Sequence, residues 1–387
     1  MITGHAIIGA NFGDEGKGLM TDFFASRDPE STIVVRFNGG AQAGHTVSCP
    51  DGRRHVFSHF GSGTLVDAPT LLSQFFLVNP VVYRKERDLL GKMNLQPLVF
   101  VDERALITTP FDMFINQVVE TKRGSSRHGS CGLGINETVT RSFASPATII
   151  HAGDLADRSV LAHKLELLAS TWLDQRLQQH HVDLSSMEVV RFKENQSAII
   201  ERFIADCRWF LDSTTLCNRC PERLTVLFEG AQGLLLDEDR LDQWPHVTRS
   251  KTGLVNVLFL ARRLGLERLR VTYVSRTYLT RHGAGPLAGE CDWSFTDRTN
   301  MPNAFQGSLR FAPLDQRMLR RSIEMDFQYA RLTYPDLQGE IAFTCADQLP
   351  MQTVEQDLPV RFISYGRTRD DVQVEKRVPA SRALVRV

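Results

Sequence analysis

The sequence has no excess of either sign of charge: its 45 lysine and arginine residues are balanced by 45 aspartate and glutamate residues. A balanced surface provides no bulk attraction to nucleic acid or to an anionic membrane, so we expect neither partner. The sequence also lacks a run of roughly 20 apolar residues and a basic, apolar leader, which would indicate a membrane span or a secretory signal. We therefore expect a cytoplasmic protein.

Cysteine is sparse, with seven residues in 387 at scattered spacings. An odd and scattered set does not form a disulfide framework, and the single CxxC motif at 217–220 has no second pair to complete a zinc site. Hydrophobic residues make up 42% of the chain, which is enough to fill a sizeable core. Any anionic ligand must therefore be bound by a local site.

Short apolar runs alternate with segments of helical length, and this pattern predicts an α/β fold with a large, mostly parallel central sheet flanked by helices. We expect a single domain over residues 1–387. The segment 155–212 is rich in Leu, Glu, Lys, Gln and Arg and predicts a helical insertion, or subdomain. Strands are predicted over residues 5–11, 31–39, 96–102, 147–153, 224–233, 269–281, 339–349 and 358–366.

The most informative segment, residues 13–18, reads Gly-Asp-Glu-Gly-Lys-Gly after the first predicted strand. Glycines between a strand and a helix allow backbone N–H groups to surround a phosphate, with Lys17 as the cation. The spacing is not that of a Walker A loop, so we expect a P-loop-like site of another kind. Asp14 would repel phosphate on its own, which indicates a magnesium ligand or a base.

A second glycine-rich cluster, residues 36–47, follows the next predicted strand and reads Arg-Phe-Asn-Gly-Gly-Ala-Gln-Ala-Gly-His-Thr-Val. His45 lies between Gly44 and Thr46, where its ring can reach a ligand. Because two strand ends of this kind occur one βαβ unit apart, we expect both to face one site.

Together these clusters resemble adenylosuccinate synthetases, and the resemblance continues in order along most of the chain. His-Gly-Ser-Cys-Gly-Leu-Gly-Ile-Asn is similar to the family's Gly-Thr-Thr-Gly-x-Gly-Ile-Gly loop, and Trp-Pro-His-Val-Thr-Arg-Ser to its Pro-x-Val-Thr-Ser-Ser element. Phe-Glu-Gly-Ala-Gln-Gly matches a family segment, and Thr-Arg-His-Gly-Ala-Gly-Pro resembles its Thr-Arg-Val-Gly-Ala-Gly-Pro. These four blocks lie at residues 128–136, 244–250, 228–233 and 280–286.

The family joins L-aspartate to C6 of a 6-oxopurine nucleotide after the γ-phosphate of a nucleoside triphosphate has activated the purine O6. The resemblance implies that Asp14 removes the N1 proton and that Lys17 neutralises the transferring phosphoryl group. His45 would contact the phosphoryl oxygens, and Gln232 would hold O6. It further implies Mg²⁺, bound by Asp14 and by the backbone carbonyl of Gly44.

The resemblance also implies a nucleotide site, an amino-acid site and a homodimer in which an arginine reaches the partner's nucleotide; Arg141 is the candidate for that arginine. The substrates would be a purine nucleoside monophosphate, a nucleoside triphosphate and L-aspartate. The implied nucleotide and phosphate ligands are Gly13, Glu15, Gly16, Gly18, Gln42, Gly44, Thr46, Ser130, Cys131, Arg141, Thr248 and Asp347. The implied amino-acid ligands are Gln306, Ser308 and Arg310.

This chain departs from the family pattern where substrates are selected. Gln42 replaces an asparagine, and Cys131 replaces a threonine of the phosphate loop. Arg310 is the single arginine left in the segment aligned with the aspartate loop, although Arg281 or Arg298 could substitute. The guanine-reading Thr-Lys-Leu-Asp corresponds to Thr-Cys-Ala-Asp at 344–347, which leaves both GTP and ATP open as donors.

Three other readings stay open beside the synthesis of adenylosuccinate from IMP. The first is the phage type of synthetase, which uses GMP or dGMP with ATP to make 2-aminoadenine nucleotides; the protein would then act in the host cytoplasm. The second is a paralogue that couples another amine or another purine-like acceptor. The third is a nucleotide-binding protein without catalysis, which would have no need of a base at Asp14 or of a histidine at residue 45.

Overall fold

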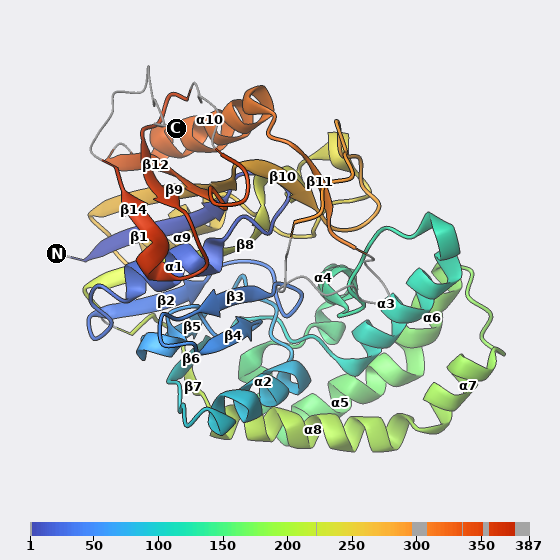
Figure 1. Cartoon of the computed structure of the whole chain (residues 1–387). Coiled ribbons are helices and arrows are strands. Elements are labelled where there is room, and N and C mark those ends of the chain that lie inside the picture. The colour runs from blue at the N-terminus through green and yellow to red at the C-terminus, as the bar shows by residue number, and fades with distance from the viewer. Residues whose placement is uncertain (1, 222, 296–307, 335, 351–355, 376–387) are drawn as a thin grey trace.

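The fold is built on one ten-stranded sheet (Figure 1). The computed structural model describes residues 2–375 apart from 222, 296–307, 335 and 351–355. All neighbouring strands run parallel except β13 and β14, so the predicted α/β class with a large, mostly parallel sheet is confirmed. In spatial order the strands are β14 (Val372–Val374), β13 (Val360–Ser364), β12 (Leu337–Thr344), β9 (Arg268–Arg276), β1 (Thr3–Gly9), β8 (Thr225–Gly233), β2 (Thr32–Arg36), β5 (Thr70–Leu72), β6 (Val99–Asp102) and β7 (Thr215–Cys217).

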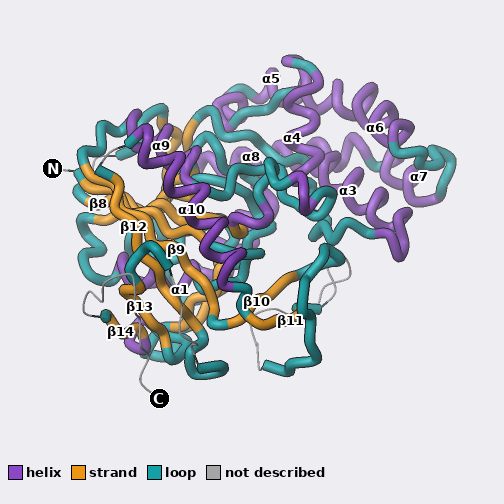
Figure 2. The backbone as a smooth tube through the Cα atoms, turned by 90° about the horizontal axis from the view of Figure 1, so that it is seen from above, coloured by secondary structure: helices purple, strands orange, loops and turns teal. Residues whose placement is uncertain are grey.

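Helices cover both faces of the sheet, which explains why its central strands are apolar without alternation. Helix α1 (Lys17–Ala25) packs on one face through Leu19 and Met20, and α9 (Leu254–Arg263) and α10 (Gln316–Thr333) pack on the other. Figure 2 shows α3 (Pro110–Arg123) to α8 (Gln196–Asp212) gathered as a lobe beyond one edge of the sheet. The helices are α1 (Lys17–Ala25), α2 (Pro80–Lys92), α3 (Pro110–Arg123), α4 (Ile135–Ala144), α5 (Arg158–Leu167), α6 (Leu173–Gln179), α7 (Met187–Glu194), α8 (Gln196–Asp212), α9 (Leu254–Arg263) and α10 (Gln316–Thr333). None of the helices in the described part of the chain is both long and apolar enough to cross a bilayer.

Two hairpins stand apart from the main sheet, β3 (His45–Ser48) with β4 (Arg54–Phe57) and β10 (Tyr278–Arg281) with β11 (Arg310–Pro313).

The strand predicted over 147–153 is wrong. The backbone there forms a 3-10 turn followed by one isolated bridge between Leu106 and His151. Ile150 and Ala152 are buried there because they join the same apolar cluster as the helical lobe, which gives the segment the composition of a strand without a ladder.

The helical lobe packs around a cluster of buried apolar residues that also includes Leu72, Val99 and Val101 of the sheet. Helix α3 begins with a capping box, in which the Thr109 side chain accepts from the Asp112 backbone and the Asp112 carboxylate accepts from the Thr109 backbone. A cavity of about 1150 Å³ lies between this lobe and the carboxyl ends of the central strands. The sheet and the lobe therefore both contribute to one candidate site.

Candidate functional site

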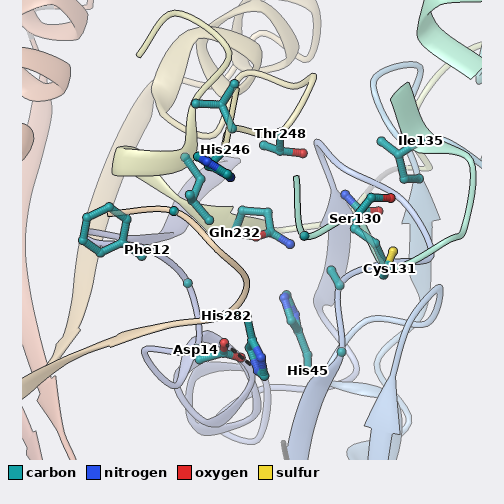
Figure 3. Close-up of a pocket in the computed structure, with 18 of the residues that line it drawn as sticks. Phe12, Asp14, His45, Ser130, Cys131, Ile135, Gln232, His246, Thr248 and His282 are labelled. Atoms are coloured by element: carbon teal, nitrogen blue, oxygen red, sulfur yellow. Dashed lines mark ion pairs between the residues drawn. The ribbon is translucent and has the colours of Figure 1, made fainter. Parts of the chain in front are cut away.

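The centre of the cavity is formed by the ends of three adjacent strands. β8 lies between β1 and β2, and all three are parallel, so the segments that follow them meet at one edge of the sheet. β1 leads into the loop that carries Asp14, β2 leads toward His45, and Gln232 is the penultimate residue of β8. Figure 3 shows Gln232 pointing into a hollow between His45 and Asp14 on one side and Ser130 and Thr248 on the other.

The 10–16 loop is held in shape by a buried carboxylate rather than by a ligand. Glu15 is 1% exposed, and it accepts from the backbone N–H groups of Asn11 at 3.1 Å and Gly13 at 2.7 Å. It also binds Lys17 Nζ at 2.6 Å. A Cβ atom at Gly9 would collide with this carboxylate, which explains the glycine there. The prediction that Glu15 binds nucleotide is therefore corrected: the side chain organises the loop and does not line the cavity.

Asp14 and Gln232 are both held in the left-handed backbone region, with φ of 61° and 64°. Residues with a Cβ adopt this conformation at a cost, and such outliers concentrate where a side chain must be aimed at a ligand. Asp14 lines the cavity, and its Oδ2 lies 3.5 Å from His282 Nε2. His282 was not assigned from the sequence.

His45 is the first residue of β3, and its ring is linked to a carboxylate of the central sheet. Its Nδ1 lies 2.6 Å from Oε1 of Glu229, and this oxygen also accepts from the Ser62 hydroxyl. The other carboxylate oxygen, Oε2, accepts from the Ser62 backbone N–H at 2.9 Å. Burial lowers the pKa of His45, and Arg36 lowers it further although Glu229 opposes both effects. The neutral ring therefore donates through Nδ1 and leaves Nε2 as an acceptor.

Glu229 stays ionised although it is fully buried. Burial alone would raise its pKa, but His45 and Arg36 outweigh that effect and lower the pKa to about 2. His45 and Glu229 form a fixed pair in which the negative carboxylate lies at the Nδ1 side of the ring. This charge favours protonation of Nε2 when a ligand binds there.

A second loop, residues 128–134, lines the cavity from the side of the helical lobe. Ser130 Oγ donates to Asn116 Oδ1 at 2.9 Å, and the same oxygen accepts from the Gly134 N–H at 3.0 Å, so α3 fixes this loop. The first turn of α4 also lines the cavity and has no side-chain cap, and the N-terminus of a helix favours an anion. Loss of water around Cys131 raises its pKa to about 11, so its thiol is a weak neutral donor.

Most of the residues that the sequence predicts for nucleotide binding line this cavity. Both polar atoms of the Gln42 side chain are buried without a partner among the described residues, which leaves them available to a ligand. Asp347 is exposed and lies outside the lining. The predicted residues that line the cavity are Gly13, Asp14, Gly16, Lys17, Gly18, Gln42, Gly44, His45, Thr46, Ser130, Cys131, Gln232 and Thr248.

The prediction for Arg141 is corrected. Arg141 is fully buried in α4, where its guanidinium binds both carboxylate oxygens of Asp112 at 2.9 and 3.0 Å. It also donates to the backbone carbonyls of Ile107 and Thr148. A side chain with these internal partners does not reach a nucleotide in another subunit.

The predicted amino-acid ligands do not converge on the cavity either. Arg310 binds Glu290 at 2.7 Å and the backbone carbonyl of Gly285, and Ser308 is exposed outside the lining. Gln306 and Arg298 lie outside the described residues. Arg281 is buried over the Phe12 ring, 4.4 Å from its centroid, and its guanidinium donates to protein oxygens. Neither Arg281 nor Arg310 is placed to hold a dicarboxylate, because internal partners occupy both.

The motif resemblance is confirmed by comparison with known sequences. The family model described as adenylosuccinate synthetase matches residues 6–308. The chain belongs to the adenylosuccinate synthetase family. The adenylosuccinate synthetase of Acaryochloris marina is 31% identical over 290 residues, covering 73% of this chain and 62% of the relative. That of Clostridium botulinum is 32% identical over 294 residues, covering 73% and 65%. The matched region thus spans less than two thirds of these relatives.

Two solved structures share the fold with this member of the family. Fully ligated adenylosuccinate synthetase from Plasmodium falciparum has a TM-score of 0.71 at 19% identity, over 96% of this chain and 99% of that one. Succinoaminodeoxyadenylate synthetase of cyanophage S-2L, bound to dGMP and dATP as an energy donor, has a TM-score of 0.59 at 15% identity, over 97% and 95%. At these identities the likeness shows the fold alone.

Proposed function

We propose that the protein is an adenylosuccinate synthetase: it joins L-aspartate to C6 of IMP, driven by a nucleoside triphosphate. The observation that carries this proposal is the meeting of Asp14, His45 and Gln232 in one cavity of about 1150 Å³. A single ligand typically fills roughly 300–1,000 Å³, so the cavity has room for two substrates at once. The location would be the cytoplasm.

The reaction divides into two displacements. Asp14 removes the N1 proton, the purine O6 attacks the γ-phosphorus, and the bond from that phosphorus to the diphosphate oxygen breaks. The amine then attacks C6, and O6 leaves as inorganic phosphate. Gln232 holds O6 during both steps. Phosphorylation is needed because an amide-like oxygen is a poor leaving group.

The neutral state of His45 gives it a defined part in the first displacement. A bound triphosphate adds negative charge near Nε2, which raises the pKa of the ring and favours its protonation. The protonated ring then donates through Nε2 to the phosphoryl oxygens, while Glu229 at Nδ1 stabilises its positive charge. Ser130, Thr248 and the first turn of α4 would hold the 5′-phosphate of the acceptor.

Magnesium fits the oxygen donors of the cavity. In the described residues no three His, Cys, Asp or Glu side chains form a metal-binding cluster, so a purely protein ligand set is absent there. Mg²⁺ is commonly held by one or two carboxylates together with substrate phosphates, and here Asp14 and the Gly44 carbonyl would supply the protein ligands. Bound there, it would neutralise charge on the transferring phosphoryl group.

A second candidate is the GMP- or dGMP-using reaction with ATP as donor. It is favoured by the cavity wall at 344–348, where Cys345 lines the space in the position of the family's lysine and Asp347 is exposed outside the lining. Both features weaken a guanine-specific donor site. A paralogue that uses another amine is favoured by the engagement of Arg310 with Glu290.

The test is an endpoint mass-spectrometric assay with Mg²⁺ and L-aspartate, in which IMP, GMP and dGMP are each paired with GTP and ATP. A succinyl adduct of IMP is the expected product. An adduct from GMP or dGMP alone would move the protein to the second candidate, and the absence of every adduct would contradict both. Light scattering on the same preparation tests the homodimer, whose donated arginine must be a residue other than Arg141.

A further inference from the structure

The backbone around Asp14 is held from the β9–β10 segment and from β12. Arg276 Nε donates to the Asp14 carbonyl at 2.5 Å, and Thr280 Oγ1 donates to the Gly13 carbonyl at 3.2 Å. Thr344 Oγ1 donates to the Glu15 carbonyl at 2.6 Å. These contacts fix the main chain in its left-handed turn, but they leave the Asp14 side chain free to rotate.

The side chain that approaches the Asp14 carboxylate is His282, directly after β10. Its Nε2 lies 3.5 Å from Asp14 Oδ2, and the two side chains are 20% and 23% exposed, so both lie in the cavity wall rather than in bulk water. Figure 3 shows the pair side by side next to His45. The contact joins the turn that carries Asp14 to the same segment that already binds its backbone.

The surroundings of the ring decide which nitrogen faces the carboxylate as a donor. His282 Nδ1 is buried and has no partner among the described residues. A neutral imidazole carries one N–H, and a lone pair on Nε2 would face the negative carboxylate unfavourably. The arrangement that suits both nitrogens has the Nε2–H directed toward Oδ2, a close electrostatic contact at 3.5 Å.

We propose that His282 is a positioning residue for Asp14, and this assignment rests on the function proposed above. By holding Oδ2, the ring restricts rotation of the carboxylate and leaves Oδ1 to accept the N1 proton of the purine. The effect concerns the geometry of the base, so it falls on the first displacement and not on substrate binding. The corresponding family segment has valine here, which has no such donor.

The test follows the first displacement without the amine. A nucleoside triphosphate labelled with ¹⁸O in the βγ-bridge is incubated with Mg²⁺ and IMP, GMP or dGMP but no L-aspartate, and scrambling of the label reports reversible phosphoryl transfer. The variants are His282→Val, which removes the donor, His282→Gln, whose terminal nitrogen reaches the place of Nε2, and His282→Asn, whose nitrogen reaches the place of Nδ1. His163→Val, on the exposed surface of α5, is the matched control.

We expect the exchange rate of His282→Val and His282→Asn to fall on the order of 10-fold, as is typical when a polar group that supports a functional side chain is removed. His282→Gln should stay within about 3-fold of the wild type, with substrate dissociation constants unchanged in all variants. Wild-type exchange rates in His282→Val, or equal losses in His282→Val and His282→Gln, would overturn the assignment alone. If the wild type shows no exchange with any acceptor, the proposed function fails and the assignment fails with it.

Discussion

Among single residues, Asp14 combines an unfavourable backbone conformation with a carboxylate that faces the cavity. Holding a residue other than glycine in the left-handed region costs on the order of 1–3 kcal/mol, although aspartate and asparagine tolerate it better than most. Hydrogen bonds from Arg276 and Thr344 to this turn offset that cost. The structure thus maintains the conformation that aims this carboxylate.

Asp14→Asn should abolish turnover without unfolding the protein. Asparagine keeps the shape and the backbone preference but cannot take a proton, so kcat should fall on the order of 10²- to 10⁴-fold while the thermal midpoint stays within about 2 °C. Asp67→Asn is a matched control, because Asp67 has a φ of 64° but lies exposed outside the cavity. Equal activity in Asp14→Asn and the wild type would exclude Asp14 as the base.

Glu229→Gln should impair catalysis through His45. The amide carries no charge to stabilise a protonated ring, so kcat should fall on the order of 100-fold in steady-state assays. Glu86→Gln offers a comparison, since Glu86 is a buried carboxylate that lies near His55 and His59 but outside the cavity. If both variants lose stability and neither loses kcat, the pair of His45 and Glu229 has only a structural role.

His5 should make folding sensitive to acid. Burial, together with Arg270, lowers its pKa from 6.5 to about 3, so between these values the unfolded chain binds a proton that the folded chain does not. Acidification from pH 7 to pH 5 should therefore cost about 2 kcal/mol of unfolding free energy at this residue. Urea unfolding at both pH values should show this loss in the wild type and its absence in His5→Gln. Parallel losses in the two proteins would contradict the assignment.

Asp14 and His45, which the sequence singles out at glycine-rich strand ends, both line the cavity. Glu229 was missed because Phe-Glu-Gly-Ala is mostly apolar and because its partner His45 lies 184 residues away in the chain. His282 was missed for a similar reason, since its neighbour Asp14 is close only in the folded chain.

At the scale of elements, apolar runs identified the long central strands and β6 but not the three-residue strands. β1 and β8 are buried on both faces, so composition predicts them directly. β5 and β7 have three residues each, too few for a periodic pattern, and β4 alternates exposed and buried residues around His55. Residues 147–153 have strand composition for another reason, because burial there comes from the helical lobe.

Helix α4 allows a test of the corrected role of Arg141. Arg141→Met would leave Asp112 buried without its cation, which should destabilise the protein by roughly 3–5 kcal/mol in urea unfolding. The Michaelis constant for nucleotide should stay unchanged in the folded fraction. Arg158→Met removes an ion pair that is about two-thirds exposed on α5 and should cost at most about 1 kcal/mol. A stable Arg141→Met variant with weak nucleotide binding would restore the original prediction.

For the whole molecule, the site exists because distant segments converge. The turn at 13–18, the loop at 128–134 and Thr248 all line one cavity between the sheet and the helical lobe. The sequence could anticipate that the segments after β1 and β2 meet at one edge of the sheet, since carboxyl ends of parallel strands share an edge, but not that β8 lies between them. The internal partners of Arg281 and Arg310 could not be anticipated, because they depend on packing around the β10–β11 hairpin, which the sequence pattern did not predict.

The central claim is that the purine O6 leaves as phosphate, and one measurement tests it directly. IMP labelled with ¹⁸O at O6 is turned over with Mg²⁺, unlabelled triphosphate and L-aspartate, and the inorganic phosphate is analysed by mass spectrometry. The proposed chemistry predicts one ¹⁸O atom in each phosphate released together with adduct. Adduct formation with phosphate that contains no ¹⁸O would contradict it, because the oxygen would then have left C6 by a route that does not pass through the phosphoryl group.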